Sequence, residues 1–156
     1  MMNKKLKLET LKKIARQLNE EGITWALGAS MLMYFNGLLK DFEDIDIMVI
    51  EKDVAVVKNI LLKMGNLQLS KKSNDFKTKV YLNFDINGVK IDVMAGFAIV
   101  TNEGVIDCSL KQEQIAGVYN LDGIEIPLQS VELWLKYYEL MGRKNKADLL
   151  RNSKKL

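Results

Sequence analysis

The sequence predicts an α+β fold in which a mixed β-sheet is flanked by helices at both ends of the chain. Apolar residues recur at helical spacing near the N-terminus and again after Ser130. Between these segments lie short β-like runs, and two of them are joined by Asn87-Gly88, the strongest short hairpin signal in the chain. No repeat or low-complexity tract interrupts the 156 residues, so we expect a single domain.

The N-terminal part is predicted to form a helix, a strand and a short second helix. Apolar residues at helical spacing between 8 and 18 indicate an amphipathic helix, and Gly22 stands where a C-terminal cap belongs. Residues 23–27 are β-like and lead into a turn of small residues at 28–30. Residues 31–35 then indicate a short helix, which completes a strand-turn-helix unit.

The middle of the chain is predicted to supply the central strands. Residues 45–50 form an apolar strand, and Asp53 is placed to cap a helix over residues 54–64. Residues 79–86 and 89–94 flank the hairpin turn, so we expect them to pair as antiparallel strands.

The C-terminal part is predicted to add strands and then helices. A further strand is expected at 98–100, and another hairpin around Asp122-Gly123. Ser130 is placed to cap a helix over 131–141, and a last, basic helix is expected at about 145–152. The mixed sheet is therefore expected to carry C-terminal helices.

Composition restricts the chemistry that is open to this chain. Its hydrophobic content of 48% and charged content of 28% are typical of a soluble globular protein, and no apolar stretch approaches the ~20 residues of a membrane span. Residues 1–13 lack an apolar core, so we expect no signal peptide, and the single cysteine, Cys108, fits a cytoplasmic protein. The absence of histidine excludes histidine-based catalysis and leaves too few ligands for zinc.

Three aspartates form the pattern that carries most information about function. Asp44 and Asp46 lie two residues apart at the start of a strand, so both side chains point to the same face. In the strand 89–94, the apolar face is directed to the core, so Asp92 points to the opposite face. If the two strands are neighbours, three carboxylates converge. A hard divalent cation held by oxygen, Mg²⁺ or Mn²⁺, is the expected partner of such a cluster, and it suggests phosphate chemistry.

Each of these side chains also has a purely structural interpretation. An isolated Asp-x-Asp is usually strand-end polarity, and Asp92 can pair with Lys90 on a solvated face. The small-residue turn upstream and the third aspartate downstream together favour the metal site. Lys40 can contact phosphate or stay solvated. The net charge of +3 resides mostly at the two ends of the chain, which suggests either solvated helix faces or affinity for a polyphosphate or RNA.

Together, these residues resemble the nucleotidyltransferase fold of the polymerase-beta type. The segments Trp25-Ala26-Leu27-Gly28-Ala29-Ser30, Asp44-Ile45-Asp46-Ile47 and Lys90-Ile91-Asp92-Val93 look closest to its small bacterial branch. That branch includes lincosamide and aminoglycoside nucleotidyltransferases and the nucleotidyltransferase toxins of abortive-infection systems. The resemblance spans about 22–93, with weaker support from 126–148. It implies one nucleotidyltransferase-like domain over 1–156, with a catalytic core at about 1–108 and a strand hairpin with C-terminal helices at about 109–156.

The resemblance implies a metal-dependent nucleotidyltransferase that moves a nucleoside monophosphate from an NTP such as ATP to a hydroxyl group. Asp44, Asp46 and Asp92 would be its catalytic residues and the ligands of Mg²⁺ or Mn²⁺, with Asp92 also accepting the proton of the acceptor hydroxyl. One departure concerns the turn, where the family usually has Gly-Gly or Gly-Ser and this chain has Gly28-Ala29. Alanine supplies no hydroxyl and resists positive φ. The implied nucleotide-binding residues are Gly28, Ala29, Ser30 and Lys40.

The sequence leaves the acceptor open. A small hydroxylated molecule such as an antibiotic is suggested by the nearest-looking branch, and RNA such as a tRNA end by the basic termini. A non-catalytic nucleotide-binding module of the same fold is the alternative suggested by Ala29. No membrane partner is expected, and a homodimer is left open because the chain has little room for a separate acceptor-binding domain.

Overall fold

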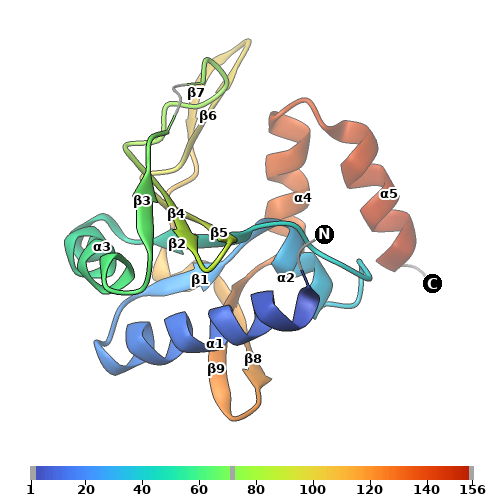
Figure 1. The fold of residues 1–156 in the computed structure, drawn as a ribbon. Coiled ribbons are helices and arrows are strands. Elements are labelled where there is room, and N and C mark those ends of the chain that lie inside the picture. Colours follow the sequence, from blue (N-terminus) through green and yellow to red (C-terminus); the bar gives the residue numbers. More distant parts are fainter. Residues whose placement is uncertain (1–2, 71–72, 155–156) are drawn as a thin grey trace.

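A seven-stranded mixed sheet organises the protein, whose computed structural model describes residues 3–70 and 73–154 (Figure 1). In the described part of the chain, no helix has the length and apolar character needed to cross a membrane. The helices are α1 (Lys4–Glu20), α2 (Ala29–Phe35), α3 (Val54–Leu62), α4 (Val131–Leu140) and α5 (Lys144–Lys154), with 3₁₀ turns at Glu51–Asp53 and Gln112–Gln114. The strands are β1 (Trp25–Leu27), β2 (Ile45–Val49), β3 (Asn66–Gln68), β4 (Val80–Ile86), β5 (Val89–Ala95), β6 (Ala98–Thr101), β7 (Gly104–Asp107), β8 (Ile115–Leu121) and β9 (Ile124–Gln129).

The strand order of the sheet is β3-β4-β5-β2-β1-β9-β8. β2 and β5 are parallel, as are β1 and β9, while the other neighbours are antiparallel. The predicted α+β class with a mixed sheet and C-terminal helices is therefore confirmed. β6 and β7 form a separate two-stranded sheet, which rises beside α4 and α5 above the main sheet (Figure 1).

The core lies between the sheet and α1, whose apolar stripe is fully buried at Leu11, Ile14 and Leu18. This stripe is the one that the helical spacing predicts. The helix begins earlier than expected, because the Asn3 side chain accepts a hydrogen bond from the Lys5 amide. Gly22 adopts a φ of 67°, in agreement with its expected role after the helix.

Both predicted hairpins are present. Asn87 and Gly88 have φ values of 53° and 86°, and Asp122 and Gly123 have φ values of 51° and 86°. Two successive positive φ values are typical of the turn that best matches the twist of antiparallel strands. These turns join β4 to β5 and β8 to β9.

Three local features differ from the sequence prediction. β3 and β7 were not expected, since they are short, largely exposed strands without apolar alternation. Asp53 does precede α3, but its carboxylate makes no bond to that helix. It accepts instead from the Thr24 amide at 3.0 Å, so it ties α3 to the strand that enters the site.

Candidate active site

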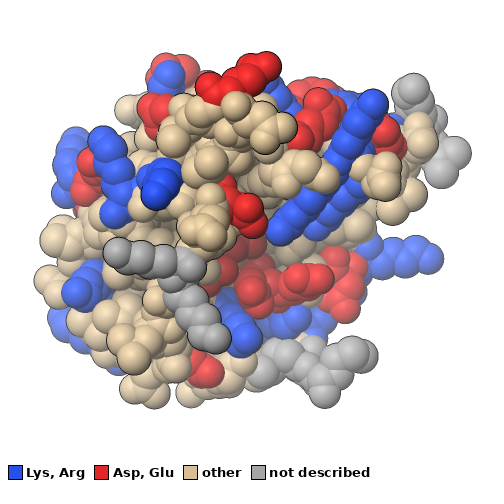
Figure 2. Space-filling model, turned by 90° about the horizontal axis from the view of Figure 1, so that it is seen from above, with Lys and Arg blue, Asp and Glu red and all other residues tan. Residues whose placement is uncertain are grey.

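The sheet brings two of the predicted aspartates into register. Asp46 on β2 is the direct partner of Asp92 on β5, and Asp44 immediately precedes β2. The alternation of side chains buries Ile45 and Ile47 completely on the core side, which leaves the aspartates half-buried on the other side. Seen from above, acidic side chains gather on the floor of a recess that basic side chains border (Figure 2).

Asp46 and Asp92 interact directly with each other. Burial raises the pKa of Asp46 well above its usual value, and the negative charges of Asp92 and Asp44 raise it further. Burial also raises the pKa of Asp92, although hydrogen bonds from the Tyr81 hydroxyl and from Asp46 act in the opposite direction. In the free protein, both carboxyl groups therefore have a raised pKa, and burial is the first cause for each.

Asp44 stands at the edge of this pair, in a field of mixed charge. Burial raises its pKa, the cations of Lys90 and Lys7 lower it, and Glu43 raises it. The Lys7 Nζ donates to the Phe42 carbonyl at 3.0 Å, so α1 holds the segment that leads into Asp44. Glu43 is exposed, as expected, but its charge also acts on Asp46, so it belongs to the surroundings of the site.

The small-residue turn is fixed against the acidic strand by two hydrogen bonds. The Gly28 amide donates to the Asp46 carbonyl at 3.1 Å, and the Glu43 amide donates to the Ser30 hydroxyl at 3.1 Å. Ala29 has a φ of 54°, a left-handed conformation that disfavours a side chain with a Cβ atom. The turn and the carboxylates are therefore neighbours, as the order of motifs predicts.

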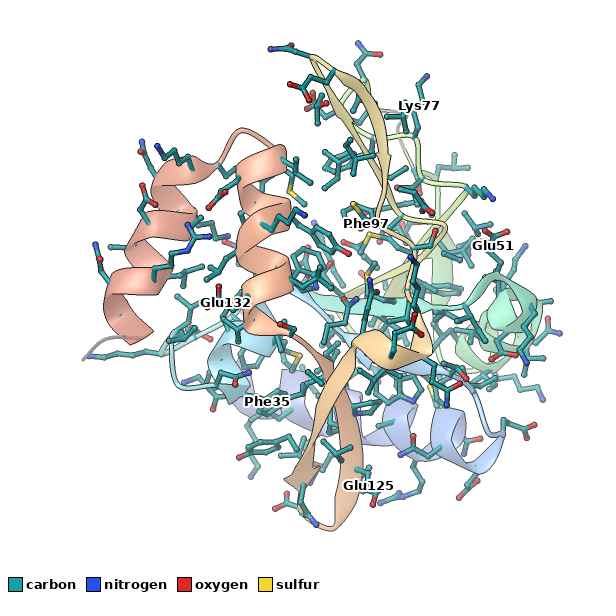
Figure 3. The ribbon with its side chains drawn as sticks, turned by 180° about the vertical axis from the view of Figure 1, so that it is seen from behind. Phe35, Glu51, Lys77, Phe97, Glu125 and Glu132 are labelled. Atoms are coloured by element: carbon teal, nitrogen blue, oxygen red, sulfur yellow. The ribbon has the colours of Figure 1, made fainter. Side chains whose placement is uncertain are left out.

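Trp134 of α4 covers Gly28 from the other side. A Cβ atom on Gly28 would lie 2.4 Å from Cζ2 of Trp134, so a side chain cannot be accommodated without movement of the indole. Trp134 is held in turn by Gln129, whose Oε1 accepts from the indole nitrogen at 2.7 Å, and by stacking on Phe97 with ring centroids 5.9 Å apart. Figure 3 shows Phe97 beside α4. Glycine is required here by this close packing.

Lys40 lies exposed in the loop before β2. Its carbonyl accepts from the Lys4 Nζ at 2.7 Å, so the loop is fastened to α1 at this point. Lys7 and Lys90 are the cations whose charges act on Asp44, and the sequence interpretation did not assign a site role to either. Strand alternation could have identified Lys90, because it lies two residues before Asp92 and on the same face of the strand. Nothing in the sequence indicates that α1, which carries Lys7, packs against the loop before Asp44.

Two tyrosines also belong to the surroundings of the carboxylates. Tyr81 lies on β4 two residues before Asn83, the residue that pairs with Asp92, so both point to the acidic face. Strand parity was the signal that could have identified it. Burial raises the pKa of Tyr138 on α4, and the charge of Asp46 raises it further. No sequence pattern relates Tyr138 to the site, because α4 arrives there by tertiary packing.

The carboxylate oxygens of the three aspartates are suitable ligands for a hard cation, although they do not form a preassembled metal site. Within residues 3–70 and 73–154, no three acidic or thiol side chains form a group that could already hold a metal ion. The negative charges of Asp92 and Asp44 nevertheless add to burial in raising the pKa of Asp46. Oxygen-only donors with surplus negative charge are what Mg²⁺ binds, so the residues present fit such an ion.

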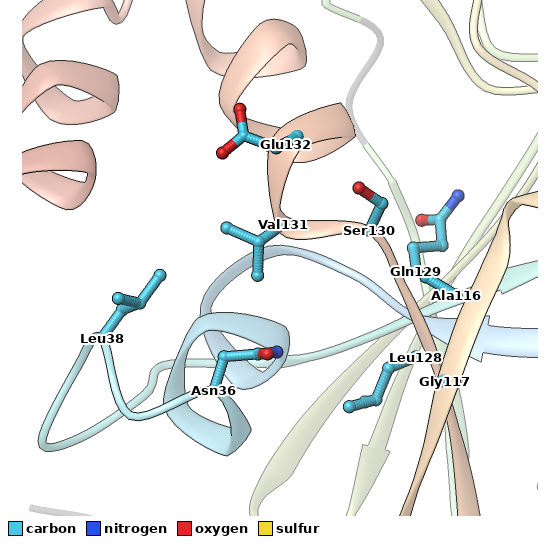
Figure 4. A pocket seen from close by; sticks show the side chains of 9 residues that line it. All are labelled: Asn36, Leu38, Ala116, Gly117, Leu128, Gln129, Ser130, Val131 and Glu132. Atoms are coloured by element: carbon cyan, nitrogen blue, oxygen red, sulfur yellow. The ribbon is translucent and has the colours of Figure 1, made fainter. Parts of the chain in front are cut away.

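A separate pocket of about 260 Å³ lies between the end of α2, the β8–β9 hairpin and the start of α4 (Figure 4). None of the three aspartates lines it, and its wall is largely apolar or uncharged, with one carboxylate, Glu132. The acidic recess is the better candidate site because it combines perturbed carboxylates with a strained turn. The lining residues are Asn36, Leu38, Ala116, Gly117, Leu128, Gln129, Ser130, Val131 and Glu132.

Comparisons with known proteins agree with this architecture. No protein-family model and no curated protein sequence matches the chain. Among solved structures, it is similar to a Thermotoga maritima protein provisionally assigned as a nucleotidyltransferase, with a TM-score of 0.77 and 22% identity over 97% of this chain and 94% of that one. It is also similar to ANT(2'')-Ia, solved with adenylyl-2''-tobramycin, with a TM-score of 0.60 and 14% identity over 94% of this chain and 95% of that one.

A further similar structure is the lincosamide antibiotic adenylyltransferase LnuA bound to lincomycin. Its TM-score is 0.62, at 14% identity over 92% of this chain and 95% of that one. The identities are low, whereas the overlap extends over nearly the whole of every chain. The protein therefore has the nucleotidyltransferase fold.

Proposed function

We propose that the protein is a Mg²⁺-dependent nucleotidyltransferase that moves a nucleoside monophosphate from an NTP to a hydroxyl group of a small-molecule acceptor. The observation that carries this proposal is the register of Asp46 against Asp92, with Asp44 at the same strand end and the Gly28 turn hydrogen-bonded to Asp46. The nucleotidyltransferase fold of the chain supports the same reaction class.

Asp44, Asp46 and Asp92 are the residues that would hold Mg²⁺. When bound, the ion would neutralise the charge that develops on the phosphate and on the departing pyrophosphate. Its positive charge would also remove the reason for Asp46 to keep a proton, since the pKa of Asp46 is raised by burial and by neighbouring anions. Both members of the Asp46–Asp92 pair would then be ionised.

Asp92 is the proposed proton acceptor. In the reaction, the acceptor hydroxyl oxygen attacks the α-phosphorus, the bond from that phosphorus to the pyrophosphate oxygen breaks, and the hydroxyl proton passes to the Asp92 carboxylate. Tyr81 orients this carboxylate through its hydrogen bond. The turn at Gly28, Ala29 and Ser30 would receive the triphosphate, with Lys40 in the adjoining loop.

The proposed acceptor is a small hydroxylated, antibiotic-like molecule. Two proteins of the same fold were solved with antibiotic ligands, ANT(2'')-Ia with adenylyl-2''-tobramycin and LnuA with lincomycin. Both match this chain over nearly its full length. An RNA acceptor is the alternative within the same chemistry. Steep salt dependence of acceptor binding would identify RNA, because each phosphate contact releases counterions.

One observation favours a second candidate, a nucleotide-binding module without transferase activity. Ala29 occupies a left-handed position at a φ of 54°, in place of glycine, and it brings no hydroxyl to the turn. Such a module would bind NTP in a calorimeter and release no pyrophosphate with any acceptor.

The direct test is a transfer assay with NTPs labelled at the α-phosphate. Each of ATP, CTP, GTP and UTP is incubated with Mg²⁺ and panels of hydroxylated small molecules and RNAs, and labelled acceptor and pyrophosphate are measured. We expect Mg²⁺-dependent labelling that is lost when Asp44 and Asp46 are both replaced by Asn. The matched control is Asp122→Asn, because Asp122 is an exposed carboxylate in a turn whose positive φ suits asparagine. Transfer that survives the double replacement would refute the mechanism.

A further inference from the structure

Two buried side chains near the candidate site have hydrogen-bond donors that are not used. Within the described part of the chain, the buried side-chain atoms without a hydrogen-bond partner are Nε2 of Gln129 and the hydroxyl of Tyr138. Gln129 is 2% exposed and Tyr138 is 1% exposed. Folded proteins seldom leave buried donors unpaired, because the lost hydrogen bonds to water are not replaced. Such atoms therefore need an explanation.

Both donors lie around Trp134. Gln129 holds the indole nitrogen with its Oε1, and its side chain also lines the pocket of Figure 4. Tyr138 follows Trp134 by one helical turn, and their ring centroids are 5.7 Å apart. Since the indole lies directly over Gly28, this face of α4 covers the turn beside the carboxylates.

The charges that act on the Tyr138 hydroxyl come from both sides of the site. Asp46 and Glu43 lie on the strand side, and Arg143 follows α4 on the other side. The Lys146 Nζ is 4.6 Å from the centroid of the tyrosine ring. Glu43 and Arg143 are exposed side chains. The Tyr138 hydroxyl is itself buried, so a ligand reaches it only after side chains around it move.

We propose that the Tyr138 hydroxyl binds the phosphate chain of the nucleotide by donating a hydrogen bond to a phosphate oxygen. This inference rests on the proposed function and adds a phosphate-binding residue from α4 that is distant in sequence from the acidic motifs. An O–H donor requires an acceptor atom, and the Lys146 Nζ, a cation 4.6 Å from the centroid of the same ring, favours an anionic ligand. Gln129 also has an unpaired donor, and its carboxamide contacts the Trp134 indole.

The test compares Tyr138→Phe with Tyr137→Phe. Phenylalanine keeps the ring contacts of Tyr138 with Trp134 and Lys146 and removes only the hydroxyl. Tyr137 is the matched control, because its hydroxyl is hydrogen-bonded to Cys108 and the charges that act on it come from Cys108 and Asp107. Binding of Mg²⁺ complexes of ATP, CTP, GTP, UTP and tripolyphosphate is measured by calorimetry, and the ligand-free Tm by thermal unfolding.

We expect Tyr138→Phe to weaken binding by about tenfold or more, by a similar factor for every NTP that binds and for tripolyphosphate, because the phosphate chain is common to all of them. Its ligand-free Tm should be unchanged or higher, since an unpaired buried donor is removed. Tyr137→Phe should show the reverse pattern, with a lower Tm and unchanged binding.

The outcomes separate this inference from the proposed function. Binding by Tyr138→Phe within twofold of the wild type would overturn the inference alone, and so would a loss confined to one base. A lower ligand-free Tm for Tyr138→Phe would also overturn it, since the hydroxyl would then have a structural partner. A wild-type protein that binds none of the Mg²⁺ complexes would overturn both.

Discussion

The two walls of the candidate site have opposite hydrogen-bonding character. The strand wall, made of Asp44, Asp46 and Asp92, has more acceptors and negative charge than its neighbours can compensate. The helix wall, made of Gln129, Trp134 and Tyr138, has buried donors without acceptors. The strand wall has surplus hydrogen-bond acceptors and the helix wall has unpaired donors. In the described part of the chain, the donors of Gln129 Nε2 and the Tyr138 hydroxyl are nevertheless not hydrogen-bonded to the carboxylates.

On the proposed function, a ligand would complete the site. A cation would relieve the repulsion on the strand wall, and a phosphate chain would supply acceptors to the helix wall. Unpaired buried donors and clustered like charges each cost stability, which is common where function and stability compete. Substitutions in one wall at a time test this difference.

The largest expected effect is on catalysis, from the strand wall. Asp92→Asn should lower the rate of nucleotidyl transfer by about 10²–10⁴-fold, because the proposed proton acceptor is removed. Transfer is measured at saturating NTP with the assay described above, and Asp122→Asn serves again as the control. A folded Asp92→Asn protein with transfer within threefold of the wild type would show that the proton leaves by another route.

The next effect concerns the contact between the walls. Gly28→Ala should destabilise the protein by about 2–3 kcal/mol, because the new Cβ overlaps the Trp134 indole and forces the helix wall outwards. The measurement is urea unfolding. Gly117→Ala is the control, since no atom lies within 4 Å of the position of its Cβ, and it should change stability by less than about 0.5 kcal/mol. Equal effects of the two changes would disprove the close packing at Gly28.

A third effect is the pH dependence of the metal-free protein. Burial and neighbouring carboxylates raise the pKa of Asp46, so above the ordinary value of about 3.9 the folded state keeps a proton that the unfolded state releases. The contribution of this group to stability therefore falls as pH rises from about 4 through the folded pKa.

Asp46→Asn removes this contribution. Unfolding in EDTA should show the variant more stable than the wild type at pH 7, by about 1.4 kcal/mol for each unit of pKa difference, and no more stable near pH 4. If the advantage of the variant is the same at both pH values, Asp46 does not hold the proton.

The smallest effect is expected at the turn. Ala29→Gly should stabilise the protein by about 0.5–1 kcal/mol, because glycine adopts the φ of 54° without steric cost, although it loses more entropy on folding. Thermal unfolding measures the gain, with Ala116→Gly on exposed β8 as a control that should lose stability. A loss at Ala29 equal to that at Ala116 would show that the turn is unstrained.

The strand wall was largely predictable from sequence, because its determinants are local. Alternation in the strand of Asp92 assigned the face of that side chain, and Asn87-Gly88 fixed the hairpin that presents it. The pairing of β2 with β5 could not be predicted from local sequence, since parallel pairing joins segments far apart in the chain. It followed from the resemblance to a known fold, and the register then brought Asp46 beside Asp92.

The helix wall could not be predicted, because its determinants are tertiary. Trp134 and Tyr138 appear in the sequence as apolar positions of an amphipathic helix, and only packing directs them to Gly28 and the carboxylates. The same holds for Lys7, whose spacing on α1 gives no indication that it reaches the Phe42 carbonyl. Short exposed strands such as β3 were missed for lack of any apolar periodicity.

The hydrogen bond from the Gly28 amide to the Asp46 carbonyl ties the turn to the acidic strand. On the proposed function, this link would keep the turn and the carboxylates aligned when a nucleotide binds. On the proposed function, α4 and α5, which are joined at Gly142 with a φ of 81°, would be left to accommodate differently shaped acceptors. Mutations in those helices would then change the range of acceptors and leave the proposed reaction unchanged.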